Sequence, residues 1–190
     1  GCGATAVRCV YAVNSGTGSK VSAIVGFTLM DGCTKGGSTS AAAQFEGGAF
    51  YAPAFGCRAQ VVDCCVTNCA ASRGVMYGGW AHRTVFDHNK LCKNASESLR
   101  NLVMSACVVK DGNLDKHGYN TIANGGLVIV NTTFAGNGNV DNATIFGQIP
   151  DGANIVLNCV VDGDKQGSCS KGACVAGNWQ SYRSGQAGWN

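Results

Sequence analysis

A short strand pattern that recurs down the chain constrains the fold more than any other feature. Each copy has a small or aromatic residue followed two places later by a large apolar one. The copies are Phe27/Leu29, Cys64/Val66, Thr84/Phe86, Cys107/Val109, Thr132/Phe134 and Cys159/Val161. Successive copies lie 37, 20, 23, 25 and 27 residues apart. Repeats with a period in the twenties are typical of solenoids, in which each repeat buries its apolar face only against its neighbours.

The two faces of each strand copy differ in composition. Successive strand residues point to opposite faces, and the aligned pairs contain only Cys, Thr, Val, Leu and Phe. The opposite set includes the charged residues Asp63, Arg83, Asp87, Lys110 and Asp162. Because an apolar interior does not accept charges without partners, we predict that the aligned pairs point inward and the charges point outward.

The remaining segments are short apolar pieces bounded by glycine, such as residues 41–51 and 73–79, and no segment of useful length has a helical period. One strand on each side of a coil predicts an all-β fold, a right-handed, single-stranded parallel β-helix of about six to seven coils. We expect a single domain over residues 1–190, with regular coils over about 21–165 and an irregular tail over 166–190. The chain is expected to be a fragment or the mature part of a longer protein.

The repeats resemble those of a known family. Residues 8–11 (RCVY), 25–32 (VGFTLMDG), 46–51 (EGGAFY) and 62–68 (VDCCVTN) resemble the right-handed parallel β-helix repeats of large bacterial secreted and surface proteins. That group includes pectin-lyase-like solenoids, adhesins and autotransporter passengers. The resemblance covers about residues 7–165 and implies a secreted or cell-surface location. Its motifs specify coils rather than chemistry, so function has to be argued from a site.

An outward row of mostly β-branched residues is the first candidate site. The row is Thr28, Cys65, Val85, Val108, Thr133 and Val160. An exposed apolar row on a flat face marks a contact surface, although β-propensity on a solvated sheet explains it equally well. Tyr51 and Tyr77 add aromatic rings that could stack on sugars, whereas Trp80 is expected to pack under a loop.

These features predict a non-catalytic module for adhesion or structural assembly. Its partner would be a cell-surface polysaccharide or another protein, including a second copy of itself. Strand addition at the exposed ends makes a self-assembling filament the alternative. The low charged fraction and the net charge of +3 indicate neither a nucleic-acid partner nor an anionic membrane, and no apolar run approaches the length of a membrane span.

A third hypothesis is a polysaccharide lyase or glycoside hydrolase. Its weak catalytic candidates are Arg83, Asp87, His88 and Lys110. Asp87 and Lys110 occupy one outward column on neighbouring coils, so the alternative to catalysis is a surface ion pair between them. Asp63 and Arg83 could form a second ion pair of this kind. No second acidic residue stacks beside Asp87 in this alignment, which leaves calcium binding and paired-carboxylate hydrolysis short of ligands. We therefore expect no catalytic residue, no metal site and no cofactor, and His82 is expected to be a solvated turn residue.

Twelve cysteines make disulfides a further question. Cys64 and Cys107 fall two coils apart in one column, beyond the reach of a disulfide, and are expected to be small buried thiols. Three other pairs could oxidise in a secreted protein. They are Cys69 with Cys92, Cys169 with Cys174, and Cys2 with Cys9.

Overall fold

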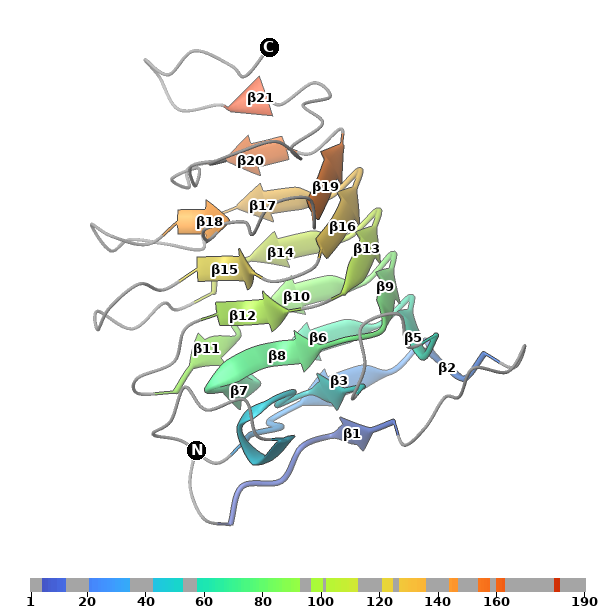
Figure 1. Cartoon of the computed structure of the whole chain (residues 1–190), viewed down its shortest axis with the longest axis vertical. Coiled ribbons are helices and arrows are strands. Elements are labelled where there is room, and N and C mark those ends of the chain that lie inside the picture. The colour runs from blue at the N-terminus through green and yellow to red at the C-terminus, as the bar shows by residue number, and fades with distance from the viewer. Residues whose placement is uncertain are drawn as a thin grey trace.

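The computed structural model places the strands in three parallel sheets. It describes residues 5–12, 21–34, 43–52, 58–92, 97–100, 102–112, 121–124, 127–135, 144–146, 154–157, 160–162 and 180–181. The strands stack along the long axis of the molecule, from the blue N-terminal strands to the orange and red C-terminal strands (Figure 1). Every pairing between strands is parallel in the described residues, which confirms the predicted all-β parallel β-helix.

The chain visits the three sheets in a fixed order on successive turns. The first sheet contains β1 (Val10–Tyr11), β4 (Phe50–Tyr51), β8 (Arg73–Tyr77), β12 (Glu97–Arg100), β15 (Thr121–Asn124) and β18 (Thr144–Phe146). The second sheet contains β2 (Ala23–Val25), β5 (Gln60–Val62), β9 (Trp80–His82), β13 (Val103–Ser105), β16 (Leu127–Val130) and β19 (Asn154–Leu157). The third sheet contains β3 (Thr28–Met30), β6 (Cys65–Thr67), β10 (Val85–Asp87), β14 (Val108–Lys110), β17 (Thr133–Ala135), β20 (Val160–Asp162) and β21 (Gln180–Ser181).

Smaller elements complete the described part of the chain. Strands β7 (Ala70–Ala71) and β11 (Lys90–Leu91) pair with each other after the third sheet, and a 3-10 helix, η1, covers Ala43–Phe45. Strand β21 pairs with β20, so the third sheet continues into the tail that the sequence predicts to be irregular. No helix in the described ranges is long and apolar enough to cross a membrane.

The strand register confirms the predicted inward columns. Phe86 of β10 aligns with Val66 of β6 and with Val109 of β14, and Val109 aligns with Phe134 of β17. The residues of both columns are buried from Cys64 to Phe134. Phe27 is the exception, since it is 63% exposed. It precedes β3, the edge strand of the third sheet, so no earlier strand of that sheet covers it.

Each corner between the second and third sheets that the structure describes contains one residue with positive φ. Asp63, Arg83, Ala106 and Asn131 have φ between 45° and 52° at this corner, and Gly26 has 75°. A second row of such residues, Asp31, Asn68, His88 and Asp111, follows the third sheet. This conformation costs an ordinary residue about 1–2 kcal/mol, less for Asn and Asp. The corners therefore store strain that the packed coils have to offset.

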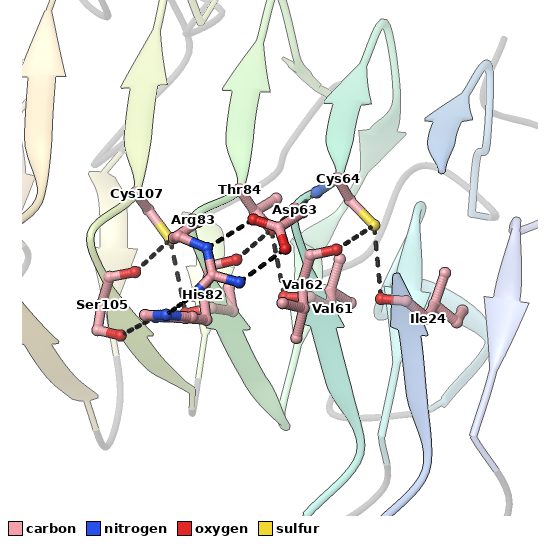
Figure 2. Close-up of polar contacts among 11 residues, drawn as sticks. Ile24, Val61, Val62, Asp63, Cys64, His82, Arg83, Thr84, Ser105 and Cys107 are labelled. Carbon is pink, nitrogen blue, oxygen red and sulfur yellow. Dashed lines mark hydrogen bonds and ion pairs between the residues drawn. The ribbon is translucent and has the colours of Figure 1, made fainter. Parts of the chain in front are cut away.

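From Cys64 to Thr132, the inward residue after each corner stabilises the turn through hydrogen bonds, as Figure 2 shows for Cys64, Thr84 and Cys107. The thiol of Cys64 donates to the carbonyl oxygen of Val62 at 3.1 Å and lies 3.5 Å from that of Ile24 on the preceding coil. The hydroxyl of Thr84 lies 3.0 Å from the carbonyl oxygen of His82 and 3.2 Å from that of Val61. This column therefore requires a small side chain that donates a hydrogen bond, which explains why Cys and Thr fill it rather than Val.

The second row of corners follows the same rule. The thiol of Cys69 lies 3.3 Å from the carbonyl oxygen of Thr67 on its own coil. On the next coil, the side-chain amide of Asn89 donates to the carbonyl oxygen of Val66 at 2.8 Å, and its oxygen accepts from the amide of Cys69 at 3.0 Å. The buried Asn89 thus joins two coils, as expected of a turn amide that bonds a stacked copy.

Candidate functional surface

The outer face of the third sheet carries the predicted row. Thr28 aligns with Cys65, Cys65 with Val85, and the alignment continues through the row to Val160. Cys65, Val85, Val108 and Thr133 are half-buried and Thr28 is exposed, whereas the side chain of Val160 lies outside the described ones. The predicted row therefore exists as a straight ladder on the outside of the solenoid.

The neighbouring outer face, on the second sheet, carries two further rows. One of its rows is Gln60, Trp80, Val103 and Val128, and the other is Val62, His82, Ser105 and Val130. The valines are half-buried, and Trp80 is 41% exposed. The expectation that Trp80 packs under a loop is wrong, because it occupies an outward position of β9. We refer to these rows of the second sheet, together with the predicted row of the third sheet, as the apolar outer surface.

The sequence contains a signal for this face that the aligned pairs alone do not reveal. In each coil the inward residue of the second sheet lies five positions before the large apolar residue of the third sheet. Examples are Ile24 and Leu29, Val61 and Val66, Ala81 and Phe86, Met104 and Val109, and Ile129 and Phe134. Because two residues, the corner residue and the small inward residue after it, lie between the strands of the two sheets, an inward column repeated at a distance of five residues predicts both sheets.

A bidentate ion pair joins two coils at the corner beside this surface. The Arg83 guanidinium donates to both carboxylate oxygens of Asp63, with Nε to Oδ1 at 2.6 Å and Nη2 to Oδ2 at 2.7 Å (Figure 2). The hydrogen bond from Arg83 lowers the pKa of Asp63, and the same bond raises the pKa of Arg83. The predicted ion-pair interpretation of these two residues is confirmed.

His82 lies beside this ion pair in β9. Its Nδ1 is 2.5 Å from the hydroxyl oxygen of Ser105, and its Nε2 is 2.5 Å from Nη1 of Arg83 (Figure 2). The expectation of a solvated turn histidine is therefore wrong, since the ring is half-buried within a strand and has partners on both nitrogens. The ring links the charged corner to the second sheet.

A second charged cluster follows the third sheet. Lys110 Nζ lies 3.3 Å from Oδ2 of Asp87 and 3.7 Å from Oδ2 of Asp111, and His88 Nδ1 lies 2.5 Å from Oδ1 of Asp87. Partial burial acts to raise the pKa of Asp87, but hydrogen bonds from His88 and Lys110 outweigh it and hold the pKa below its usual value. The bond to Asp87 raises the pKa of Lys110.

The cluster is an ion-pair network by its geometry. Ligand atoms of Asp87, His88 and Asp111 lie within 4.8 Å of one another, so Asp111 is an acidic neighbour that column alignment missed. The ammonium group of Lys110 lies within ion-pair distance of both carboxylates. Arg83 and Asp87 flank opposite ends of β10, four residues and about 13 Å of extended chain apart. The four catalytic candidates therefore do not form one site, and the predicted Asp87–Lys110 ion pair is confirmed.

The tyrosines form a stack on the first sheet. The ring of Tyr51 packs between Tyr11 and Tyr77, with centroid distances of 5.3 and 5.4 Å. The guanidinium of Arg8 lies 5.0 Å from the centroid of Tyr51, which is only 6% exposed. The prediction of Tyr51 as a binding-surface residue is wrong because its neighbours cover the ring, whereas Tyr77 remains half-buried.

The cysteines differ from the predicted pairs. Cys64 and Cys107 are buried free thiols, as expected, but Cys69 and Cys9 are also free, so the predicted pairs Cys69–Cys92 and Cys2–Cys9 are wrong. Cys92 is disulfide-bonded, to a cysteine other than Cys69. The register explains the error for Cys92, because Leu91 aligns with Ala71 and the neighbour of Cys69 on the next coil is Asn89. Cys2, Cys169 and Cys174 lie outside the described residues.

Comparison with known proteins identifies no relative of this chain. No protein-family model, no curated protein and no solved structure matches the chain. Its assignment to the parallel β-solenoids therefore rests on the three stacked parallel sheets themselves.

Proposed function

We propose that this chain is a non-catalytic module of the cell surface or extracellular space that serves adhesion or structural assembly through its apolar outer surface. The observation that supports the proposal most is the register of that surface. Trp80, Val103 and Val128 form one straight row on a flat sheet, beside a second straight row that contains Val85 and Val108. Flat apolar faces of this kind are typical of interaction sites.

The distribution of charge supports a surface that binds rather than reacts. Asp63 is paired with Arg83, and Asp87 with Lys110, in both cases between neighbouring coils. The Asp63–Arg83 pair lies at the corner between the rows of the second and third sheets, and the Asp87–Lys110 pair lies beside the third-sheet row, so the rows themselves contain no Asp, Glu, Lys or Arg. Rows of uncharged, mostly apolar side chains flanked by paired charges fit the mixed composition of protein interfaces, which favours a protein, including a second copy of this chain, over a polysaccharide as partner.

The disulfide at Cys92 supports the proposed location. Disulfides persist in secreted and surface proteins and are rare in reducing compartments. The resemblance of the coils to bacterial secreted solenoids agrees with this location, and it remains a resemblance of structural motifs.

A pair of lysine substitutions tests the proposal. In the full chain, Val103→Lys and Val108→Lys each place a charge in the middle of one apolar row, where a partner would have to desolvate it. We expect each to weaken self-association in sedimentation velocity, or glycan-array binding, by about tenfold or more, since desolvating a charge in an interface costs at least 1.4 kcal/mol. Phe27→Lys, at the end of the solenoid, is the matched control and should leave binding unchanged. Unchanged binding in both surface variants would refute the proposal.

A filament subunit is a second candidate, supported by the N-terminal end. Most of the exposed large apolar side chains among the described residues lie on or next to β1, β2 and β3, which are the edge strands of their sheets. They are Val7, Tyr11, Val21, Val25, Phe27 and Met30. Edge strands with exposed apolar side chains favour the addition of a further strand. In this case Phe27→Lys should abolish self-association, while Val103→Lys should not affect it.

A further inference from the structure

Two free thiols from different parts of the chain meet near the N-terminal end of the solenoid. Cys9 directly precedes β1 and is exposed, whereas Cys69 follows β6 and is fully buried. The thiol of Cys9 lies 3.4 Å from the carbonyl oxygen of Met30, and that of Cys69 lies 3.6 Å from the carbonyl oxygen of Leu29. Both sulfur atoms therefore lie against β3.

The absence of a side chain at Gly32 lets the two thiols approach. Cys33 and Ala70 form a parallel bridge, so Gly32 and Cys69 occupy neighbouring positions on adjacent coils. A Cβ atom on Gly32 would lie 2.5 Å from Sγ of Cys9. The thiol of Cys9 thus fills the place of the missing side chain, next to Cys69 in the same inward column. Neighbouring positions in such a column are about 4.8 Å apart.

The electrostatics agree with this contact. Burial is the main cause that raises the pKa of Cys69 to about 12, and charge repulsion by Cys9 and a side-chain hydrogen bond with Cys9 add to it. Cys64 and Cys107 provide the contrast, because they share a column but are separated by Thr84 on the intervening coil.

We propose that Cys9 and Cys69 form a disulfide that ties the start of the chain to the second coil, with a small-molecule disulfide such as oxidised glutathione as the oxidant. The exposed Cys9 reacts first: its thiol loses a proton to solvent, its sulfur attacks one sulfur of glutathione disulfide, and a glutathione thiolate leaves. Cys69 then attacks Sγ of Cys9, its proton passes to the departing second glutathione thiolate, and the Cys9–Cys69 bond forms. Two thiols are oxidised and one glutathione disulfide is reduced to two glutathione molecules.

This bond would close the loop between residues 9 and 69. The loop contains β1, β2 and β3, the strands that form the open end of the three sheets. A cross-link over a long loop stabilises a fold mainly by restricting the unfolded chain. The thiol pair would thereby hold the first coil in place under oxidising conditions, whichever surface the protein uses for binding.

Peptide mapping of the full-length protein tests the proposal. The purified protein is incubated with glutathione at about 1 mM in mixed redox states, free thiols are blocked, and digested peptides are identified by mass spectrometry. A preformed thiol contact has an effective concentration well above millimolar. We therefore expect the Cys9–Cys69 cross-link to exceed the Cys9–glutathione adduct by at least roughly tenfold.

Two variants and an internal control make the outcome specific. In Cys69→Ser the Cys9–glutathione adduct should accumulate, and in Cys9→Ser residue 69 should stay reduced. In wild type, the half-buried outward thiol of Cys65 serves as the internal control for adduct formation. The cross-link should also raise the melting temperature of oxidised wild type above that of oxidised Cys9→Ser. The proposal is overturned if Cys9 remains a glutathione adduct in wild type, or if it links to Cys2 or Cys33 instead.

Discussion

Replacing Thr84 by valine removes the hydroxyl group at an inward corner and leaves the shape of the side chain almost unchanged. That hydroxyl accepts from the amide of Cys64 at 3.5 Å and has its proton available to the carbonyl oxygens of Val61 and His82. Thr84 is fully buried, so water cannot replace these bonds. One accepted and one donated bond are lost, each worth about 1 kcal/mol. We expect Thr84→Val to lower the free energy of unfolding by about 2 kcal/mol.

Two further variants show whether the hydroxyl is the cause. Thr84→Cys keeps a donor of the kind that Cys64 and Cys107 use at the equivalent corners, so it should cost about half as much. Thr133→Val makes the same chemical change on the outer face and should lie within about 0.5 kcal/mol of wild type. Urea unfolding followed by far-ultraviolet circular dichroism gives the unfolding midpoints. The midpoints are compared only between variants whose unfolding free energy depends equally steeply on urea, because solenoids can depart from two-state unfolding. If Thr84→Val were as stable as Thr133→Val, the corner explanation would be refuted.

Two more predictions follow from the corners. Arg83 lowers the pKa of Asp63, so the stability from this pair should be present above the usual carboxyl pKa of 3.8 and be lost as the pH falls below it. In Asp63→Asn, the urea midpoint should therefore fall less steeply with decreasing pH than in wild type. The same decrease in both proteins would contradict this prediction. A Cβ atom on Gly32 would lie 2.3 Å from the carbonyl oxygen of Gly48, so Gly32→Ala should cost about 2 kcal/mol or more. By contrast, Gly26→Asn should stay within about 1 kcal/mol, since nothing lies within 4 Å of its Cβ position and Asn131 takes the same corner conformation; equal melting temperatures for the two variants would show the reasoning to be wrong.

The third sheet could be predicted from the sequence because its side chains follow a strict rule. From Cys64 to Thr132 the inward position after each corner holds a small hydrogen-bond donor, and the position two residues later holds a large apolar side chain, so these copies can be aligned from the sequence alone. The second sheet was missed because its inward residues range from Ala81 to Met104, and these share no chemical type. Only their constant distance of five residues from the third sheet identifies them.

Features that depend on irregular loops could not be predicted from the columns. Tyr51 is buried because it stacks between Tyr11 and Tyr77, which are 40 and 26 residues away across loops of unequal length. Glu46 and Arg73 are both buried, with Oε1 and Nη1 3.4 Å apart, although each lies in a segment that otherwise reads as apolar. The wrong prediction of a Cys69–Cys92 pair has the same origin. The residue next to Cys69 on the following coil is Asn89, which lies three positions before Cys92.

We propose that the apolar outer surface, and not the charged cluster, mediates the interactions of this protein. The most direct test compares Val103→Lys with Lys110→Ala in the same self-association and glycan-binding assays. The apolar variant should lose binding by about tenfold or more, and the cluster variant should retain it, because Lys110 serves an ion pair between coils. Retained binding in Val103→Lys together with lost binding in Lys110→Ala would contradict the account.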